Sequence, residues 1–486
     1  GGNKSTATAS MSAGKSWRSF GVGLALQALR TDGYVLVPPE QRGAVDVAAG
    51  TSDIAGSLML SKTFGPRVRS FLRFGSFGES RRNGTPLQIN DTRITSLDLG
   101  GDWSSWHAGD FSLRLYGSSE NFNQNFTAVA VDRNSEVLTN RQRNPSQQLG
   151  FAFQWRRPLG DMHLISAGVE GRHVRGHSAE RFVDAGGRQR AVGFFGNYSL
   201  PVRSWFVVSL GARVDTWRNY EGFSNLNSFL DRSETAFSPR VSVLRRFDNG
   251  LSISVSAYRA FRTPTLNELY RNFRVGNVVT NANSNLGAER LTGGEAGAGF
   301  QTLGEKLFIR GNFYWSEISD SVANVTLSAT PALITRQRQN LGAIRARGIE
   351  LSAVFKPNKD WELASEYLLS DSTVLRFPAN QILEGLYLPQ IPRHQFNFQI
   401  SYTDGRWTAA TQGRFVGQQF DDDLNALPLR RYFTLDAEVS RSVSERVRLF
   451  AAFQNLTGVR YEISSTPVFT LGPPVLFRAG LRLSLR

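Results

Sequence analysis

Apolar and polar side chains alternate strictly along the last stretch of the chain, Val475–Arg486. From Phe477 to Leu485 the odd positions carry Phe, Ala and Leu, and the even positions carry Arg, Gly and Ser. Because successive side chains of an extended strand point to opposite faces, one face of this strand is apolar and the other carries arginine. In a water-soluble sandwich the apolar face would cover a core. In a membrane barrel it would face lipid.

Strand-like runs recur along the whole chain, about 20 residues apart, and no convincing amphipathic helix interrupts them. The connections alternate between two kinds. The short ones are rich in Gly, Asp, Asn and Pro, for example Gly14–Ser16, Phe64–Arg67, Phe247–Gly250 and Thr403–Arg406. The long ones are polar, for example Thr31–Asp53, Asn121–Pro145, Arg262–Arg290 and Ser370–Pro392. This asymmetry predicts an all-β fold, a transmembrane antiparallel β-barrel with short periplasmic turns and long extracellular loops.

The tryptophans support the same interpretation. Seven of them lie beside short connections: Trp17, Trp103, Trp106, Trp155, Trp205, Trp361 and Trp407. Trp217 and Trp315 lie about ten residues further along their strands, which is one membrane crossing away. We therefore expect two interfacial girdles of tryptophan at the two ends of the strands. A spanning helix is excluded, since no run approaches the roughly 18 apolar residues that it needs.

About 21 strands are visible, whereas bacterial single-chain barrels have an even number, so we expect 22. A turn at Gly14–Ser16 makes Ser5–Ala13 a descending strand, which predicts one further strand upstream of it. The inward parity of several strands carries small residues, as at Ser252, Ser254 and Ser256. Small inward residues favour a lumen into which another body fits.

Composition narrows the function classes. The formal net charge is +15, but the basic residues are spread along the entire chain rather than clustered on one element, so no nucleic-acid partner is expected. There is no cysteine, which leaves no disulfide framework and no thiolate metal site.

Three stretches resemble TonB-dependent outer-membrane receptors. The first reads YRAFRTPTLNELY at 258–270 and continues as NLGAER at 285–290. The second is NLGAIRARGIEL at 340–351, and the third is FQNLTGVRYE at 453–462. The segments 31–34 and 41–46 also look like the first long loop of that family. The likeness covers nearly the whole chain, in the family's order.

The resemblance implies a 22-stranded importer of scarce solutes such as siderophores (with their iron) or cobalamin, resident in the bacterial outer membrane. Its partners would be outer-membrane lipid, the small-molecule substrate and TonB. The family also has an N-terminal plug and a TonB-contacting box, and nothing in this sequence corresponds to either. We therefore expect residues 1–486 to form one receptor-like barrel domain without its plug and first strand.

Other candidate chemistry is weaker. His173 and His177 are four apart, which on a strand is about 13 Å and too far for one metal ion. Asp421–Asp423 is an oxygen-rich triplet that could bind calcium, although a solvated acidic loop is favoured. The glycine-rich run Gly293–Gly299 leads into no helix, so it forms no phosphate cradle. No Gly-x-Ser-x-Gly elbow occurs. We expect neither enzymatic activity nor a cofactor, and a barrel phospholipase or protease is the enzymatic alternative.

Ligand binding is expected in the long loops, where arginines and aromatic rings concentrate. Guanidinium groups bind carboxylates and chelated-metal anions, and rings stack on planar ligands. The candidate ligand-binding residues are Tyr34, Arg42, Arg81, Arg82, Phe122, Phe126, Arg181, Arg218, Tyr220, Arg271, Phe273, Arg274, Arg336 and Arg338. The alternative is a passive porin, which has fewer strands and a constriction loop folded inward. A soluble propeller would show internal repeats, and none is evident.

Overall fold

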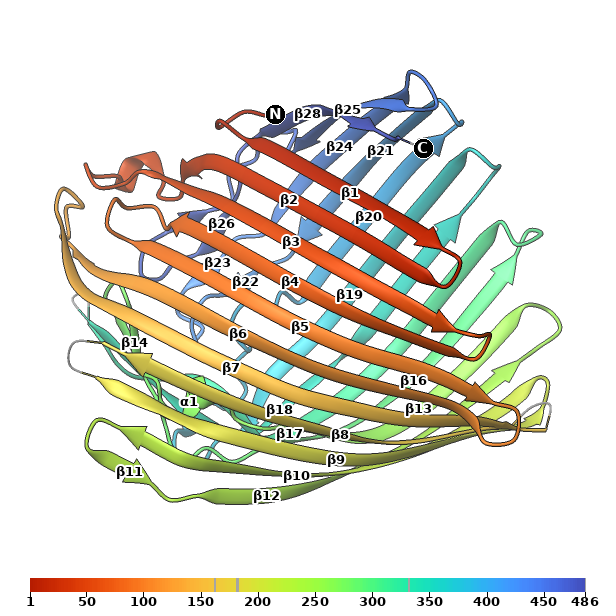
Figure 1. The fold of residues 1–486 in the computed structure, drawn as a ribbon. Helices are drawn as coiled ribbons and strands as arrows, with labels where there is room; N and C mark the ends of the chain where they lie inside the picture. Colours follow the sequence, from red (N-terminus) through yellow and green to blue (C-terminus); the bar gives the residue numbers. More distant parts are fainter. Residues whose placement is uncertain (161–162, 181–182, 331–332, 486) are drawn as a thin grey trace.

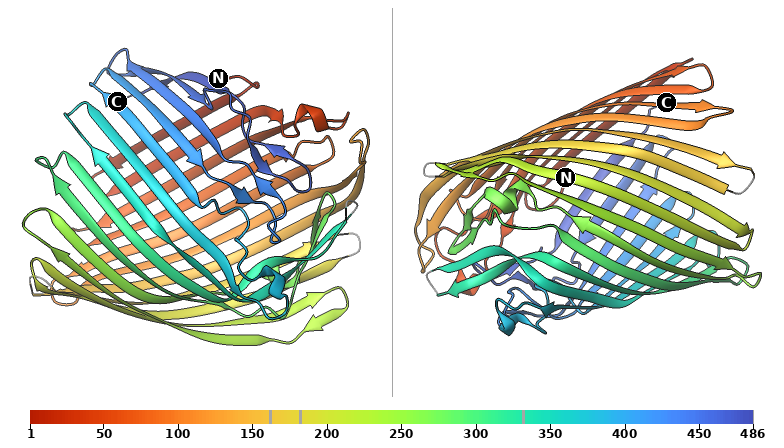
Figure 2. Two further views of the ribbon diagram at one scale, coloured as in Figure 1. Left: turned by 180° about the vertical axis from the view of Figure 1, so that it is seen from behind. Right: turned by 90° about the horizontal axis from the view of Figure 1, so that it is seen from below.

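The chain forms one large barrel whose strands follow each other round the wall in sequence order (Figures 1 and 2). The structure, a computed structural model, describes residues 1–160, 163–180, 183–330 and 333–485. Within these residues one sheet holds 24 strands, of which β11, β14 and β15 are short pieces of connections, leaving 21 wall strands. The predicted transmembrane antiparallel barrel is confirmed, as is the count of about 21 strands, whereas the expected 22nd strand stays a prediction.

The wall strands are β1 (Ala7–Trp17), β2 (Phe20–Val35), β3 (Ala48–Phe64), β4 (Val68–Arg82), β5 (Ile89–Ser105), β6 (Gly109–Val129), β7 (Glu136–Leu159), β8 (His163–Ala179), β9 (Asp184–Arg203), β10 (Phe206–Ser224), β12 (Arg232–Arg246), β13 (Leu251–Arg262), β16 (Glu289–Thr302), β17 (Leu307–Ala329), β18 (Ile334–Phe355), β19 (Trp361–Arg376), β20 (His394–Thr403), β21 (Trp407–Val416), β24 (Tyr432–Ser442), β25 (Val447–Gln454) and β28 (Leu476–Leu483). The connections contain β11 (Asn227–Phe229), β14 (Phe273–Val275), β15 (Val278–Asn281), β22 (Gln419–Phe420), β23 (Pro428–Leu429), β26 (Glu462–Ser464) and β27 (Thr470–Leu471), with α1 (Leu266–Tyr270) and the short 3-10 turns η1 (Pro39–Gln41) and η2 (Gln381–Leu383).

Neighbouring wall strands pair antiparallel throughout. The sheet also meets itself, because residues Gly1–Asn3 lie against β28. The amino group of Gly1 donates to the carbonyl of Ala479 at 2.8 Å, and the amide of Ala479 donates to the carbonyl of Gly1 at 2.8 Å. Gly2 and Arg478 form an antiparallel bridge. Both ends of the chain therefore lie at the same seam of the barrel (Figure 1).

One rim carries tight turns, and we call it the turn rim; the opposite rim, with the longer connections, is the loop rim. The turn rim uses glycines with positive φ, such as Gly250 (85°) and Gly405 (87°), which suit the tight reversal. The predicted turn at Gly14–Ser16 was wrong. Those residues stay in the β1–β2 ladder, with Gly14 opposite Gly23, and the chain reverses at Arg18, whose φ is 42°.

The loop rim has shorter connections than the sequence predicted, because the strands run further. β6 continues to Val129 and β7 begins at Glu136, so most of the predicted loop Asn121–Pro145 is paired strand. The connection between β2 and β3 likewise shrinks to residues 36–47. The long connections that remain follow β13, β19, β21 and β25.

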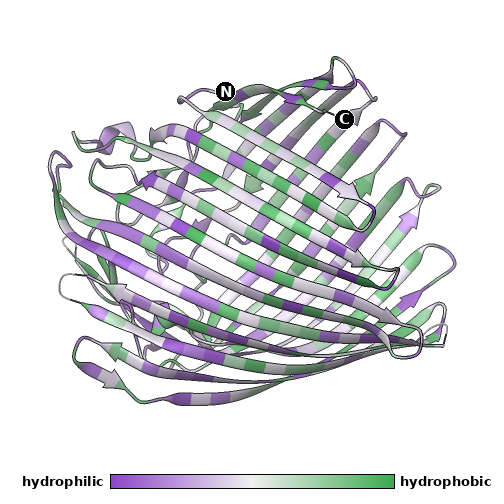
Figure 3. Cartoon of the chain, in the orientation of Figure 1, coloured by the Kyte–Doolittle hydropathy of each residue, from purple (hydrophilic) through white to green (hydrophobic). Residues whose placement is uncertain are grey.

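Register separates an apolar outer face from a polar lumen face. Opposite each other on β4 and β5, Phe74 faces Leu97 on the outside, and Arg73 faces Asp98 on the inside. The outer side chains are exposed to the surroundings, 45% for Phe74 and 53% for Leu97, as lipid-facing residues must be. The closing strand β28 follows the same alternation, and the green and purple bands of Figure 3 show it around the wall.

Inward glycines make room for lumen aromatic rings. A Cβ on Gly150 would lie 2.3 Å from the ring of Tyr116, and a Cβ on Gly348 would lie 2.6 Å from the hydroxyl of Tyr314. Each ring thus lies flat over the glycine of the neighbouring strand. These glycines are in regular strands, so close packing rather than an unusual φ explains them.

The tryptophan prediction needs one correction. Trp106 at the turn rim is 82% exposed and Trp315 is 36% exposed, as interfacial rings are. Trp217, predicted for the second girdle, is only 2% exposed and stacks on Phe261 with ring centroids 5.0 Å apart. It faces the lumen side and is covered by the connection that contains Ala288. Among the described helices, none has the length and hydropathy of a membrane span.

Candidate functional site at the loop rim

The connection between β13 and β16, residues 263–288, folds inward over the lumen face of β8, β9 and β10 (Figures 1 and 2). Its helix α1 buries Leu269 and Tyr270, which are 2% and 5% exposed. The ring of Tyr270 lies over Gly187 and Gly222, where a Cβ would meet it at 2.7 Å and 2.5 Å. We call this connection the inner loop.

Local sequence explains why the inner loop adopts one shape. Thr265 and Glu268 form a capping box that starts α1, and Arg262 binds both Glu268 (3.0 Å) and Glu289 (2.6 Å) at the base of the loop. Burial alone would raise the pKa of Glu268, but the hydrogen bond and charge of Arg262 hold it below the ordinary value. The carbonyl of Pro264 accepts a buried hydrogen bond from Gln189 at 3.0 Å.

The inner loop connects two different parts of the wall. Arg271, just after α1, donates to the side-chain oxygens of Gln142 on β7 and Gln124 on β6. On the other side, β15 pairs in parallel with β18. Arg338 of β18 donates to the carbonyl of Arg271 at 2.9 Å. The loop therefore spans the mouth of the barrel from β6–β7 to β18.

Two of the predicted arginines meet around one ring in this loop. The guanidinium of Arg271 lies 5.8 Å from the ring centroid of Phe273, and that of Arg338 lies 5.1 Å from it. Burial lowers the pKa of Arg271 to about 10, and the charge of Arg338 adds to the effect. Arg271 still carries its proton at neutral pH. Since both guanidiniums bind protein oxygens, their first role is to hold the inner loop.

Two of the stretches that carry the family resemblance contain asparagines that hold loops in place by hydrogen bonds. Asn340 accepts from the amide of Gly287 at 2.9 Å and donates to its carbonyl at 3.2 Å, which ties β18 to the end of the inner loop. Asn455, 1% exposed, binds the amide and carbonyl of Val459 and the carbonyl of Pro473. It fixes the connection between β25 and β28. These residues explain the fold of the loop rim and carry no information about a ligand.

The acidic triplet Asp421–Asp423 also fastens loops, so the prediction of a solvated acidic loop was wrong. One oxygen of Asp421 accepts from the amides of Ser465 and Thr466, both at 2.8 Å. Asp423 accepts from Thr326 at the end of β17. Burial opposes ionisation of Asp421, yet the hydrogen bonds from Gln390, Ser465 and Thr466 lower its pKa below the ordinary value. Within the described ranges no cluster of His, Cys, Asp or Glu has the geometry of a metal site.

A cavity of about 400 Å³ opens beside this triplet at the loop rim. Its wall combines apolar residues of the local core with a few polar groups, the usual make-up of a small-molecule site. The polar groups are Asn324, Arg336, Tyr387, Gln390 and Asp421–Asp423. The Nε of Arg336 is buried and has no hydrogen-bond partner among the described residues. Among the predicted arginines that the structure describes, Arg336 combines a place in this cavity wall with a donor that has no partner.

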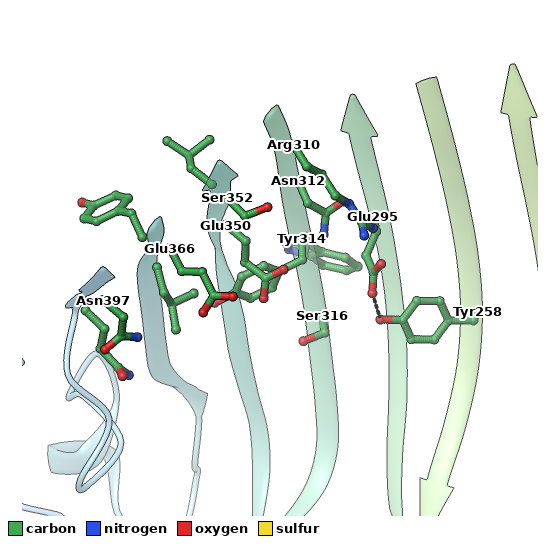
Figure 4. A pocket seen from close by; sticks show the side chains of 15 residues that line it. Tyr258, Glu295, Arg310, Asn312, Tyr314, Ser316, Glu350, Ser352, Glu366 and Asn397 are labelled. Carbon is green, nitrogen blue, oxygen red and sulfur yellow. Dashed lines mark hydrogen bonds between the residues drawn. The ribbon is translucent and has the colours of Figure 1, made fainter. Parts of the chain in front are cut away.

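A second hollow, of about 600 Å³, lies in the lumen wall formed by β13 and β16–β20 (Figure 4). Tyr258 donates to Glu295 at 2.9 Å. Glu350 and Glu366 point into the same hollow and have no hydrogen-bond or ion-pair partner in the described part of the chain. Arg310 lines it as well. This part of the lumen therefore presents free carboxylates to which a solute or a protein domain inside the barrel can bind.

The structure places most of the other candidate residues in intramolecular contacts. Arg42, Arg81, Arg82 and Arg274 donate to Val37, Glu79, Ala48 and Gly276, and Arg218 pairs with Asp231. Tyr34 lies on β2, and Phe122 and Phe126 lie on β6, where Phe126 is buried at 7% exposure. Arg218 and Tyr220 alternate with the lumen-facing residues of β10, so their side chains lie on the outer face of the barrel and not in its mouth. Arg181 lies outside the described residues.

Sequence reasoning missed Asn324, Tyr387 and Gln390 as cavity residues. Asn324 comes from β17, and Tyr387 and Gln390 come from the connection between β19 and β20, so nothing in the local sequence places the two segments side by side. It also missed Glu350 and Glu366, although their inward parity could have been read from the alternation of β18 and β19.

Comparison with known protein families identifies the family of this chain. The family described as TonB dependent receptor-like, beta-barrel, matches residues 41–456. The chain belongs to this family. Its members are transport receptors of the bacterial outer membrane rather than enzymes. One curated protein to which this chain is similar is the probable TonB-dependent receptor BfrD of Bordetella pertussis, 23% identical over 147 residues. That match covers 30% of this chain and only 19% of BfrD.

Solved structures of TonB-dependent receptor type share the fold. The copper transporter OprC superposes with a TM-score of 0.83 and 15% identity, over all of this chain and 79% of OprC. The siderophore receptor PirA of Acinetobacter baumannii gives a TM-score of 0.77 at 13% identity, over 99% of this chain and 78% of PirA. The ferric-catecholate import receptor Fiu of E. coli K12 gives 0.77 at 13%, over 99% and 80%. At these identities the likeness establishes the fold alone.

Proposed function

We propose that this TonB-dependent receptor barrel imports a scarce solute across the outer membrane and binds it first at the loop rim. The observation that carries the proposal is the cavity beside Arg336, which combines an apolar lining with an unused guanidinium donor at the mouth of the barrel. The loops around it are fastened by buried carboxylates and amides, so the site is preformed.

The expected substrate class is a compact metal chelate or another anionic solute, such as a siderophore complex or cobalamin. A guanidinium binds carboxylate and catecholate oxygens by charge-assisted hydrogen bonds. Tyr387, whose ring stacks on Phe420, adds an aromatic edge and a hydroxyl to the cavity wall. The structural neighbours are described as receptors or transporters for ferric catecholates, siderophores, iron and copper, which supports this class.

We also propose that a plug occupies the lumen of the complete receptor and moves when TonB supplies energy. A barrel of this width is not sealed by its own side chains. The carboxylates of Glu350 and Glu366 are complementary to a basic surface of such a plug. The domain assignment, residues 1–486 as a barrel that works with a separate plug, is part of this proposal.

One observation favours the porin alternative. The inner loop folds into the mouth, as the constriction loop of a porin does. The 21 wall strands and the family match favour the importer instead. In the importer the inner loop would narrow the mouth around the bound solute, whereas in a porin it would set the size of a permanent channel.

Ligand titration of the refolded barrel tests the binding proposal. Quenching of tryptophan fluorescence would be followed with a ferric-catechol complex and, separately, with Cu²⁺. Arg336→Gln should weaken binding of the anionic complex by about 10- to 100-fold, the value of one charged hydrogen bond. Arg274→Gln, which removes an exposed arginine that donates to the carbonyl of Gly276, is the matched control. Equal affinities of both variants and the wild type would contradict the site.

Single-channel conductance tests the plug proposal separately. The 486-residue barrel in a planar bilayer should show a steady open conductance that a solute does not gate. A closed, high-resistance barrel would contradict the need for a plug, whatever the titration shows.

A further inference from the structure

A basic surface lies on the outside of the barrel, where no substrate in the lumen can reach it. We call it the outer basic patch. Its members are His173 and Arg175 of β8, Arg188 and Arg190 of β9, and Arg218 and Tyr220 of β10. The register aligns them in two rows across the three strands, His173–Arg190–Arg218 and Arg175–Arg188–Tyr220.

The parity of these strands fixes the outward direction of the patch. Arg213 and Asp215 of β10 form the lumen-side ion pair at 2.7 Å, so Arg218 and Tyr220 have the opposite parity. Further toward the turn rim, the same outward parity carries Val169, Phe194 and Val214, aligned in one row. Phe194 is 60% exposed and Val214 is 44% exposed, as side chains in contact with hydrocarbon are.

The patch therefore begins two rows beyond the row of Val169, Phe194 and Val214, and the row that contains Val192 lies between them. Rows of the same parity are separated by two residues, which is about 7 Å along a strand, and neighbouring strands are about 4.8 Å apart. In a bilayer, the groups at this height are the headgroups of the leaflet on the loop-rim side. A cation placed there meets lipid phosphates rather than bulk water.

The charges of the patch are only partly neutralised within the protein. Arg188 pairs with Glu221 at 3.1 Å, and Arg218 pairs with Asp231. Arg175 and Arg190 have no acidic partner in the described part of the chain, and both are exposed. The patch keeps a surplus of positive charge directly above an apolar surface.

Contacts among the patch side chains hold the groups in place. The Nε2 of His173 and the hydroxyl of Tyr220 share a hydrogen bond of 2.9 Å. The guanidiniums of Arg190 and Arg218 each lie 5.9 Å from the centroid of the Tyr220 ring. Neighbouring guanidiniums on one platform can bind the same phosphate with several charge-assisted hydrogen bonds, which is the arrangement that arginine favours.

We propose that the outer basic patch binds the phosphorylated headgroup of an outer-leaflet lipid, with Arg175 and Arg190 as its principal ligands. The patch would anchor β8–β10 at a fixed height in the membrane. These are the strands on which the inner loop rests, so the bound lipid would also stiffen the wall behind that loop.

Lipid retention measured by native mass spectrometry tests the proposal. The barrel would be released from bilayers of phosphatidylcholine mixed with phosphatidic acid, a lipid with a phosphomonoester headgroup. The wild type should retain phosphatidic acid in preference to phosphatidylcholine, and the preference should fall with added salt. Arg175→Gln/Arg190→Gln should lower retention about tenfold or more, since two charged donors are lost.

Matched variants separate this site from nonspecific charge. Arg73→Gln/Arg240→Gln removes the same charge from the lumen face and should leave retention unchanged, whereas Arg175→Lys/Arg190→Lys should restore part of it. Far-ultraviolet circular dichroism confirms that each variant is folded. Equal loss in both glutamine variants would overturn the proposal, as would equal retention of the two lipids by the wild type. Full displacement of the lipid by inorganic phosphate would show a free-anion site and overturn it too.

Discussion

The two rims of the barrel are built on different physical principles. Every buried hydrophobic side chain among the described residues lies at the loop rim, in clusters such as Val325, Leu341 and Val374. The middle of the barrel and the turn rim expose their large apolar residues instead, with Leu97 at 53% and Trp106 at 82%. Lipid takes the place of a core around the strands. The loops at this rim bury part of their apolar groups in these clusters, although loop tips such as Val131 and Leu226 stay fully exposed.

The two rims should therefore differ in how much a substitution changes stability. A side chain at the turn rim touches lipid or water, so its loss removes few protein contacts. Many side chains at the loop rim are packed or hydrogen-bonded between connections that are distant in sequence. Mutations of similar chemistry should therefore differ strongly between the rims.

A tryptophan pair makes the largest expected contrast. Trp217→Ala should destabilise the loop rim by about 3–5 kcal/mol, because it leaves a cavity under Ala288 and beside Phe261. Trp106→Ala should change stability by less than about 0.5 kcal/mol in detergent, because it is a surface substitution. Denaturant unfolding followed by circular dichroism measures both. Similar losses for the two variants would contradict the difference between the rims.

Asn455 tests the hydrogen-bonded fasteners. Asn455→Ala leaves the amide and carbonyl of Val459 and the carbonyl of Pro473 without their partner, which should cost about 2–4 kcal/mol locally. The connection 455–475 should then be cleaved by protease while the wall strands stay intact. Asn249→Ala, at a turn-rim site where one amide loses its acceptor, is the control. If the connection in Asn455→Ala resisted the protease, Asn455 would not be what holds it in place.

Asp421 tests the same idea through pH. Its pKa is lowered in the folded protein, so its stabilising effect is complete above the ordinary value near about 3.9 and is lost as pH falls through the lowered pKa. Asp421→Asn should loosen the segment Ser464–Thr466 by about 1–3 kcal/mol at neutral pH. Hydrogen exchange of that segment, measured at pH 7 and at a pH below the lowered pKa, should differ between wild type and variant only at the higher pH. A constant difference would contradict the role of the charge.

The smallest effect is expected at the turn rim. Lys356 and Glu362 form an ion pair of 2.8 Å whose side chains are 57% and 42% exposed. Lys356→Gln should change the unfolding free energy by less than about 1 kcal/mol, because water screens exposed pairs. Denaturant unfolding measures the change, and a loss of about 3 kcal/mol would show that side-chain contacts stabilise the turn rim more than we infer.

The sequence was sufficient to predict the barrel because the relevant signal is local. Alternation along β28 and the turn residues at Gly250 and Gly405 are read directly from neighbouring positions. The loop rim was harder. Trp217 was expected in a girdle, and Asp421 in a solvated loop, because the groups that bury them come from connections far away in the sequence.

The binding site was predictable only as a region. Most of the candidate arginines lie at the loop rim, but Arg271 and Arg338 hold the inner loop, and Arg218 faces outward. Composition could not separate these roles, since an arginine that binds a carbonyl and one that awaits a ligand look alike in the sequence. Arg336 is distinguished only by its unpaired Nε and the cavity beside it.

The measurement that tests the central claim most directly is cysteine accessibility along β4 and β28. The chain has no cysteine, so each single-cysteine variant reports on one position. In lipid vesicles, Arg73→Cys and Arg482→Cys should react with a charged, water-soluble thiol reagent, and Phe74→Cys and Leu481→Cys should not. Equal reactivity at the neighbouring positions, or the reverse pattern, would contradict a wall with lipid on one face and a wet lumen on the other.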